Sequence, residues 1–468
     1  MKFVTNLNHS LLLRFASCLW LPALLAAAPA AQAQVVATDP DEEVVDEEDE
    51  TTTDDEVQAN VLSMVEIPDD LDEIDIPVPS FIKKNANHII LNGADWGKLR
   101  SAILSSTTQP VNIVHIGDSH VQADFSTGTV RQLLQYDFGN AGRGLISPLK
   151  LSGTNEPTDY FMQSRNSWIP NKLMSSRWLQ TVGFTGASIR PASSSSEITI
   201  GTSEADDYNP FSSLTIFHSG KLNVKSVTDA AGNSLQFRSI PSRDYTQIVL
   251  PSAQTKVTVN FNSAGDLTVF GASLSGDRPG IFYHAIGNNG AAFETYNRIG
   301  NVGVGIAPLK PDLVILSLGT NEAFGRLDTQ SLTRSIDRLV SNIRSANPEA
   351  LIMLTTPMEC QKSVTTTKRT RVRLKGRRKG YRTVNRSTRS YSVNRNIAPI
   401  RDAILSYGKD KGIAVYDWYE VAGGNGASST WVNNNLFAKD RVHHSRKGYN
   451  LEGRLLYEAL IDALSAKN

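Results

Sequence analysis

Two hydrophobic patterns alternate along much of the chain. Continuous apolar runs that end in polar turns, such as residues 111–117 and 313–318, are typical of strands buried on both faces of a parallel sheet. Apolar residues at helical spacing follow, as at residues 127–139 and 327–348. Strand and helix keep alternating up to a final helix over residues 445–464. This order predicts an α/β domain, with a parallel sheet covered by helices on both faces.

A different pattern interrupts this series between residues 189 and 280. Short runs there alternate apolar and polar residues with a period of two, and turn residues separate the runs. Strands of this length and spacing predict an antiparallel β-sandwich inserted into the α/β domain. We therefore expect residues 79–188 and 281–468 to form the α/β domain and residues 189–280 to form the inserted domain.

Residues 1–33 have the composition of a secretory signal. Basic residues precede the apolar run of residues 15–28, and a small-residue site ends at Ala33, after which we expect cleavage. A membrane anchor is the alternative, but the run is short for a span and contains Pro22. No later segment has 18 consecutive apolar residues, so no stable membrane insertion is expected. The sequence thus predicts a protein of the bacterial periplasm or of the extracellular space.

The net charge of zero hides a segregation of charge along the chain. Between Asp39 and Asp75 there are 18 acidic and no basic residues, whereas the chain beyond residue 75 has 45 basic and 29 acidic residues, an excess of 16 positive charges. Residues 34–78 are therefore predicted to be a disordered linker, either a tether or a solvated tail. The basic remainder favours an anionic polymer as the partner. The strongly basic segment 368–389 is expected to be a solvated loop facing such polymers, and no nucleic-acid partner is expected.

A serine follows the first buried strand, in the sequence Gly117-Asp118-Ser119. Gly-Asp-Ser is also ordinary turn chemistry. At a turn from strand to helix, however, the serine lies at the carboxyl edge of the sheet, where open α/β folds bind their ligands. Ser119 is therefore a candidate nucleophile, which needs a general base and donors for an oxyanion.

The candidate base precedes the last helix. Asp440 and His443 are three residues apart, a spacing that can place the carboxylate against one imidazole nitrogen and leave the other for Ser119. His444 is the competing base. An exposed polar loop that caps the helix is the alternative interpretation of this segment.

Two further residues are candidate donors to an oxyanion. Asn321 follows a buried strand on the same edge as Ser119, where its side-chain amide can donate a hydrogen bond. Gly290 permits close approach of the backbone to a ligand, so its N–H is a second candidate. Both residue types are also common in turns.

Four segments of the sequence resemble the sequence blocks of the SGNH hydrolase superfamily, also called GDSL esterases. They are IGDSH, NNGA, LGTNE and DRVH. The resemblance implies a flavodoxin-like α/β fold and a serine esterase that uses no metal or other cofactor. It implies a catalytic triad of Ser119, Asp440 and His443. It also implies an oxyanion hole formed by the N–H groups of Ser119 and Gly290 and the side chain of Asn321.

The sequence departs from the superfamily pattern at two positions. Glu322 stands where the family has Asp, but it is not the expected donor. His120 stands where the family name has Leu, and GDSH followed by QAD is similar to the branch that contains peptidoglycan O-acetylesterases. That branch also carries a β-sandwich insertion resembling a carbohydrate-binding module, in the place of residues 189–280.

These features predict an exported serine esterase that removes O-acetyl groups from an envelope polysaccharide, with peptidoglycan favoured. The same triad would serve an O-acetyltransferase or a general acyl esterase or lipase. A catalytically inactive glycan-binding protein is the alternative from another class. Trp418, Tyr419 and Trp431 lie near the last motif, where they can stack on sugar rings or pack in the core.

Overall fold

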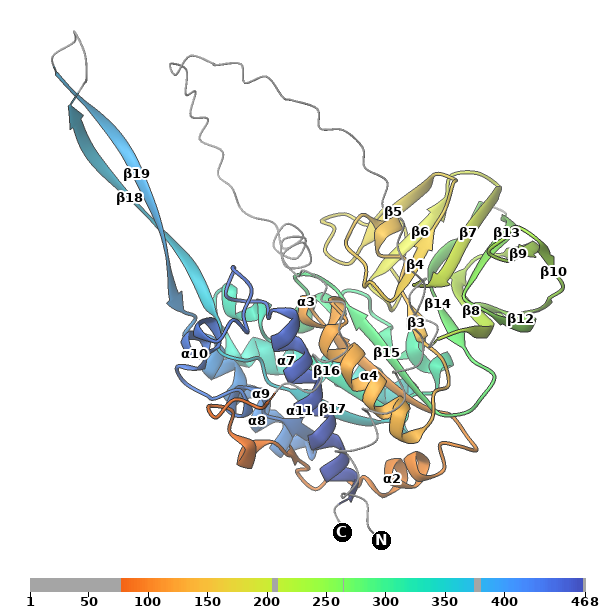
Figure 1. Cartoon of the computed structure of the whole chain (residues 1–468), viewed down its shortest axis with the longest axis horizontal. Coiled ribbons are helices and arrows are strands. Elements are labelled where there is room, and N and C mark those ends of the chain that lie inside the picture. The colour runs from red at the N-terminus through yellow and green to blue at the C-terminus, as the bar shows by residue number, and fades with distance from the viewer. Residues whose placement is uncertain (1–76, 204–208, 264, 374–379, 466–468) are drawn as a thin grey trace, which may run out of the picture. The chain divides into compact units, whose positions relative to one another are not determined.

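The computed structural model describes residues 77–203, 209–263, 265–373 and 380–465. The predicted signal segment, and all but the last two residues of the predicted linker, lie outside these ranges. A six-stranded sheet has the order β1-β20-β17-β16-β2-β15 (Figure 1). Neighbouring strands are parallel except for β1, which pairs with β20 in the antiparallel direction. The strands are β1 (Ile89–Ile90), β2 (Val111–Gly117), β15 (Ile281–Gly287), β16 (Leu313–Ser317), β17 (Leu351–Thr355) and β20 (Ala414–Tyr416).

Helices cover the two faces of this sheet. From β2 to β15 the chain crosses the sheet in one direction, and from β16 through β17 to β20 it crosses in the other. Since crossovers between parallel strands are right-handed, the helices of the two series lie on opposite faces. The first group is α2 (Gly97–Leu104), α4 (Phe125–Phe138) and α11 (Arg446–Ser465), which pack together. The second group is α5 (Phe293–Asn297), α6 (Val302–Ile306), α7 (Thr329–Ala346) and α8 (Ile397–Lys411). The predicted α/β fold is confirmed.

The burial of the strands explains their sequence pattern. Leu313, Val314, Ile315 and Leu316 of β16 are all fully buried, because β16 lies inside the sheet with helices on both faces. The helix that follows, α7, begins where the side chain of Asp328 accepts a hydrogen bond from the N–H of Ser331. Only one side of α7 is buried, which gives it the helical spacing seen in the sequence.

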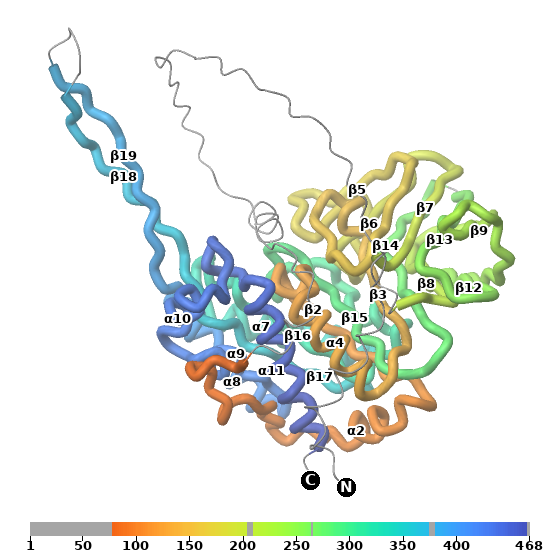
Figure 2. Tube along the Cα trace, viewed as in Figure 1, coloured from red at the N-terminus to blue at the C-terminus, as the bar shows by residue number. Residues whose placement is uncertain are grey.

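Two antiparallel sheets form the inserted domain, and their facing sides enclose a separate hydrophobic core. Figure 2 shows that this part of the chain, coloured from yellow to green, lies between α4 and β15 in the sequence. One sheet has the order β10 (Ser234–Leu235), β9 (Leu222–Thr228), β13 (Lys256–Ser263), β7 (Ser195–Thr202) and β4 (Tyr160–Gln163). The other has the order β11 (Arg238–Pro241), β12 (Tyr245–Gln254), β8 (Phe211–Ser219), β14 (Thr268–Ser275), β6 (Ala187–Pro191) and β5 (Trp168–Lys172), and β3 (Gly144–Ile146) also pairs with β14.

The predicted start of the inserted domain at residue 189 is too late. Strands β3, β4, β5 and most of β6 precede that residue and belong to the two sheets. Strands β4 and β5 are edge strands, and β5 contains Pro170, which an edge tolerates. Short edge strands show little two-residue periodicity, so the sequence pattern began only with the longer strands.

The basic segment 368–389 is not the loop that was predicted. Most of it belongs to a β-hairpin of β18 (Gln361–Arg373) and β19 (Tyr381–Val393) (Figure 1). Nearly all side chains of this hairpin are exposed or half-buried. With no buried face, polar residues occupy both sides of the strands, and the usual alternation of apolar and polar positions is missing.

Candidate active site

Four segments of the chain meet at the carboxyl edge of the central sheet. Strand β2 leads into the short helix α3 (Ser119–Gln122), and β15 leads into the loop with Gly290. Strand β16 leads to Asn321. The fourth segment is the loop between α10 (Ala427–Asn433) and α11, which carries Asp440 and His443. Parallel strands bring their carboxyl ends to one edge, which is why residues so far apart in sequence meet here.

The turn that presents Ser119 lies directly on the ends of two strands. Asp118 caps α3, since its Oδ1 accepts a hydrogen bond of 3.0 Å from the N–H of His120. A Cβ at Gly287, the last residue of β15, would lie 1.9 Å from the backbone nitrogen of Gln122. Only glycine at this position lets α3 approach the sheet so closely. The approach fixes where Ser119 stands.

Ser119, His443 and Asp440 form a continuous chain of hydrogen bonds. Ser119 Oγ lies 2.7 Å from Nε2 of His443, and Nδ1 of His443 lies 2.6 Å from Oδ2 of Asp440. The other carboxylate oxygen, Oδ1, accepts hydrogen bonds of 2.9 Å and 3.0 Å from the N–H groups of Val442 and His443. With Nδ1–H donating to the carboxylate, Nε2 can take the proton of the serine hydroxyl.

The surroundings of Asp440 keep it ionised. Burial alone would raise its pKa, but the hydrogen bond and the charge of His443 hold the pKa below its usual value. A carboxylate in this state can stabilise an imidazolium at His443.

His444, the competing base, packs among aromatic side chains. It is buried, and its ring centre lies 4.8 Å from that of Trp431. Its Nδ1 is 3.3 Å from Oε2 of Glu452. Of the two neighbouring histidines, His443 is therefore the one placed to act as the base for Ser119.

His120 lies between both of these histidines. Its ring centre is 5.1 Å from that of His443 and 5.2 Å from that of His444. Its Nδ1 lies 3.1 Å from the hydroxyl of Tyr449. Burial, together with the charges of the two histidines, holds the pKa of His120 well below its usual value. A neutral His120 adds no positive charge beside His443.

Asn321 and Gly290 lie beside the Ser119 turn, as the resemblance implies. The side-chain Nδ2 of Asn321 donates to the carbonyl of Ala291 at 2.9 Å and lies 3.4 Å from Oδ2 of Asp118. Gly290 is buried and has a φ of +74°, a conformation that side chains rarely adopt. The structure thus brings Ser119, His443 and Asp440 together, and the segments of Asn321 and Gly290 contact the serine turn through Asp118 and Gln122.

Gln122 is a buried residue of the site that the sequence analysis did not single out. Its Oε1 accepts a hydrogen bond of 2.8 Å from the N–H of Asn289, next to Gly290. Its Nε2 donates to the carbonyl of Asn155 at 3.0 Å. Gln122 therefore joins the serine turn to the Gly290 loop. Gln122 belongs to the QAD segment, which in the sequence analysis indicated only the branch of the superfamily that the chain resembles.

Glu322 also holds the site together. Its Oε1 accepts a hydrogen bond of 2.8 Å from the N–H of Phe293, the first residue of α5. Burial raises the pKa of Glu322, although hydrogen bonds from backbone groups, including that of Phe293, oppose the rise. The residue discounted as a departure from the family pattern thus ties the segment of Asn321 to the loop of Gly290.

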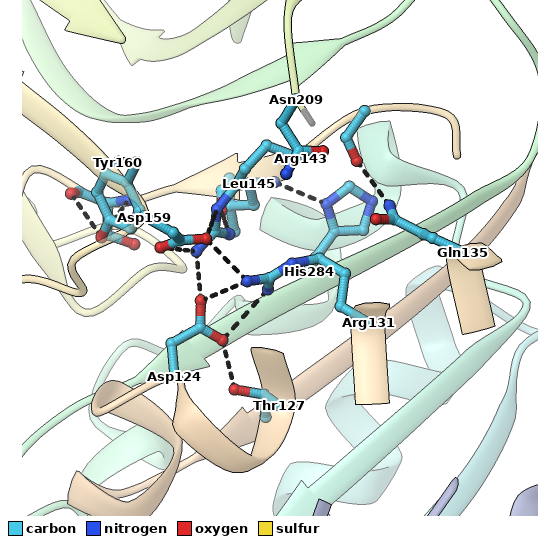
Figure 3. Close-up of polar contacts among 12 residues, drawn as sticks. Asp124, Thr127, Arg131, Gln135, Arg143, Leu145, Asp159, Tyr160, Asn209 and His284 are labelled. Atoms are coloured by element: carbon cyan, nitrogen blue, oxygen red, sulfur yellow. Dashed lines mark hydrogen bonds and ion pairs between the residues drawn. The ribbon is translucent and has the colours of Figure 1, made fainter. Parts of the chain in front are cut away.

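Figure 3 shows a cluster of four charged residues, of which Asp124, Arg131 and Arg143 are buried and Asp159 is half-buried. Asp124, which has a φ of +53°, binds both Arg131 and Arg143. Asp159 accepts hydrogen bonds of 2.9 Å from each of the same two arginines. Burial alone would raise the pKa of Asp124, but the two guanidinium charges hold it below its usual value. Since Asp124 follows α3 and Asp159 precedes β4, the cluster connects the serine turn with the inserted domain.

Three aromatic residues near the last motif are core residues. Trp418, Tyr419 and Trp431 are only 4%, 6% and 0% exposed, so packing and not sugar stacking is their role.

Cys360 is buried as well, and burial raises the pKa of its thiol to about 12.

The fold and the site together define a carboxylic ester hydrolase of the SGNH type. Residues 262–451 match the model of the GDSL-like lipase/acylhydrolase family. The match begins within the inserted domain and leaves Ser119 outside it, because the insertion separates the first sequence block from the others. None of the curated proteins compared with the chain matches it in sequence.

Solved structures with the same fold include one described as a peptidoglycan O-acetylesterase in action. It has 21% sequence identity and a TM-score of 0.61, and 80% of this chain and 97% of that chain are covered. A lipase/acylhydrolase from Enterococcus faecalis has 18% identity and a TM-score of 0.27, with 40% and 80% covered. A family two carbohydrate esterase from Clostridium thermocellum has 12% identity and a TM-score of 0.28, with 64% and 99% covered.

None of the helices in the described part of the chain has the length and apolar character that a membrane span requires.

Proposed function

We propose that this protein is an exported esterase that removes O-acetyl groups from a cell-envelope polysaccharide, with peptidoglycan as the favoured substrate. The observation that carries the proposal is the hydrogen-bonded chain from Ser119 through His443 to Asp440. In this proposal Ser119 is the nucleophile, His443 is the general base and Asp440 orients and stabilises the imidazole.

The reaction follows from this geometry in two stages. Ser119 Oγ attacks the acetyl carbonyl carbon while its proton passes to Nε2 of His443. The bond from that carbon to the sugar oxygen then breaks, and His443 gives the proton to this departing oxygen, which becomes a hydroxyl group. Water attacks the acetyl-enzyme with His443 again as base, and acetate leaves as Ser119 regains its proton.

The oxyanion of each tetrahedral intermediate needs donors that already stand in place. We assign this role to the N–H groups of Ser119 and Gly290 and to the side-chain amide of Asn321. The links made by Gln122 and Glu322 support this assignment, because they tie the three donor segments to one another.

Several observations favour an anionic envelope polymer as the substrate. The chain beyond residue 75 has 45 basic and 29 acidic residues, which attracts polyanions over long range. The solved structure with a TM-score of 0.61 is described as a peptidoglycan O-acetylesterase. The composition of residues 1–33 supports export, which would bring the protein to such a polymer.

The test compares the mature chain from Gln34 with its Ser119→Ala variant. Acetate release is measured from O-acetylated peptidoglycan and from acetylated xylan. We expect release from peptidoglycan by the native protein and its loss in the variant. Release from xylan alone would contradict the proposed substrate, and equal release by the variant would contradict the proposed nucleophile.

An O-acetyltransferase would use the same three residues. It differs only in whether water or a sugar hydroxyl accepts the acetyl group. The same experiment separates the two activities if an unacetylated glycan is added, because a transferase would acetylate this glycan instead of releasing acetate.

A further inference from the structure

The hairpin of β18 and β19 is a long, exposed element of this fold. Its two 13-residue strands pair in register from Gln361 opposite Val393 to Arg373 opposite Tyr381. At about 3.4 Å per residue, the paired strands are about 40 Å long. Two-stranded hairpins that bury no face are marginally stable in water. The hairpin adds little to the hydrophobic core, and this points to a role for its surface.

The register of the strands sorts the positive side chains onto two faces. Residues directly opposite one another share a face, and successive residues alternate between faces. One face, called the arginine face here, carries Arg369, Arg371, Arg373 and Arg389 together with Tyr381 and Tyr391. The opposite face, called the valine face, carries Lys362, Lys368, Arg382 and Arg386 together with Val364, Val372 and Val384. Each face thus has four cationic residues, but only the arginine face has aromatic rings.

The charges on the hairpin are not balanced within it. Residues 361–393 include no Asp or Glu. Like charges on one face of a sheet repel each other, so this accumulation lowers the stability of the hairpin. An anionic partner that lies along the face would remove this repulsion.

The arginine face leads to the loop that carries the catalytic histidine. Tyr391 donates a hydrogen bond of 3.1 Å to the carbonyl of Lys439, and the guanidinium of Arg441 lies 4.1 Å from the centre of the Tyr391 ring. Gln361, at the base of the same face, donates its N–H to the carbonyl of Arg441 at 2.9 Å. Lys439 and Arg441 flank Asp440, so the row of positive charge ends beside the triad.

The chemistry of the arginine face fits a carboxylate-bearing glycan. Guanidinium groups bind carboxylates through two parallel hydrogen bonds. Tyrosine rings add a flat apolar face with a polar tip, which suits a sugar ring. Arginines at every second position of β18 lie about 7 Å apart, and such a row fits a polymer with repeated negative charges better than it fits a small ester.

We propose that the arginine face binds the anionic glycan whose acetyl groups the triad removes, and that it guides the polymer to the loop of Asp440 and His443. This inference rests on the proposed function and adds the site where the polymer is held. The bound glycan would contact Arg369, Arg371, Arg373 and Arg389, and it would continue past Tyr391 toward Ser119.

The test compares two variants that each remove four positive charges. The first replaces the four cations of the arginine face: R369Q, R371Q, R373Q and R389Q. The second replaces those of the valine face: K362Q, K368Q, R382Q and R386Q. Deacetylation is measured on O-acetylated peptidoglycan over a range of salt concentrations, and on 4-nitrophenyl acetate, which is too small to reach the hairpin.

We expect the arginine-face variant to lose about tenfold or more in kcat/KM on peptidoglycan and to lose most of the salt dependence. Its kcat/KM on 4-nitrophenyl acetate should equal that of the native protein. The valine-face variant should stay within about twofold of the native protein on both substrates.

Four results would overturn the inference. The first is a native rate of the arginine-face variant on peptidoglycan, and the second is an equal loss of activity in both variants. The third is an equal loss of activity on the polymer and on the small ester. The fourth is tighter binding of duplex DNA than of peptidoglycan to the arginine face at physiological salt. Failure of the native protein to deacetylate peptidoglycan is a separate result, which would contradict the proposed function itself.

Discussion

Ser119 Oγ and His443 Nε2 lie 2.7 Å apart although 324 positions separate them in the chain. The serine belongs to the turn after β2, and the histidine belongs to the loop before α11. Their contact depends on the packing of α11 against α4, the helix that follows the serine turn. The geometry of the triad is therefore a property of the whole α/β domain, and several variants can test it.

Asp440→Asn should leave the fold intact and remove most of the activity. The amide would favour the wrong imidazole tautomer and would not stabilise the imidazolium, so kcat should fall by about 10⁴-fold. Initial rates on 4-nitrophenyl acetate measure the effect. Asp462→Asn, at an exposed position of α11, is the matched control and should keep the native rate. A rate within tenfold of the native protein would show that Asp440 does not orient His443.

Asn321→Ala should affect the transition state more than substrate binding. Loss of one oxyanion donor typically lowers kcat by about 10²–10³-fold. KM should change little, since the donor acts on charge that develops during the reaction. Steady-state kinetics on a small ester separate the two constants. An effect confined to KM would contradict the oxyanion assignment.

Glu322 offers a test of positioning as opposed to catalysis. Glu322→Gln keeps an oxygen that can accept from the N–H of Phe293, whereas Glu322→Ala removes it. We therefore expect the Gln variant to retain most of the native kcat. The kcat of the Ala variant should fall by about tenfold or more, towards the loss caused by removing an oxyanion donor. Equal activity of the two variants would mean that this hydrogen bond does not position the Gly290 loop.

The buried charge cluster should be essential for stability. Arg143 is only 1% exposed, and its removal in Arg143→Met leaves Asp124 and Asp159 with one arginine between them. Breaking a buried ion pair in this way costs about 3–5 kcal/mol of unfolding free energy. Urea unfolding at neutral pH measures the loss. Arg338→Met, which breaks a pair with Glu294 that is exposed on both sides, is the control and should leave the unfolding midpoint almost unchanged.

His284 should make the protein sensitive to acid. Its Nδ1 accepts a hydrogen bond of 3.0 Å from the N–H of Leu145, and burial, with the charges of Arg143 and Arg131, lowers its pKa from 6.5 to about 3. Below pH 6.5 the unfolded chain takes up a proton that the folded chain refuses, so this residue destabilises the fold by about 1.4 kcal/mol for each pH unit of acidification. The effect is absent above pH 6.5 and stops growing near pH 3.

The variant His284→Asn removes this titration and keeps an oxygen acceptor for Leu145. Its unfolding free energy is compared with that of the native protein between pH 7.5 and pH 4.5. Relative to the native protein, the unfolding free energy of the variant should rise by about 1.4 kcal/mol for each pH unit below 6.5. A difference that is independent of pH would show that the pKa of His284 is the same in the folded and the unfolded chain.

The sequence predicted the central sheet because burial on both faces leaves a visible pattern. The apolar residues of β16 have no polar alternative inside the sheet, and the polar turn that follows marks its carboxyl end. The positions of Ser119, Asn321 and His443 followed from such ends. What brings them together is the order of the strands, and this was available only through the resemblance to a known family.

Features that depend on one contact between distant segments were not predictable. The roles of Gln122 and Glu322 arise from single hydrogen bonds to Asn289 and Phe293, more than 25 positions away. The hairpin was missed for a different reason. Its strands bury neither face, so no hydrophobic period marked them.

The insertion between β2 and β15 has a consequence for the order of folding. Strand β2 pairs with β15 and β16, and both lie beyond the inserted domain in the chain. During synthesis, which starts at the N-terminus, strand β2 has no neighbouring strand of its sheet until about 170 further residues have been made. Most strands of the two antiparallel sheets pair with strands nearer in sequence, so we expect these sheets to close first. The serine turn would then gain its supporting strands late, and Asp440 and His443 last of all.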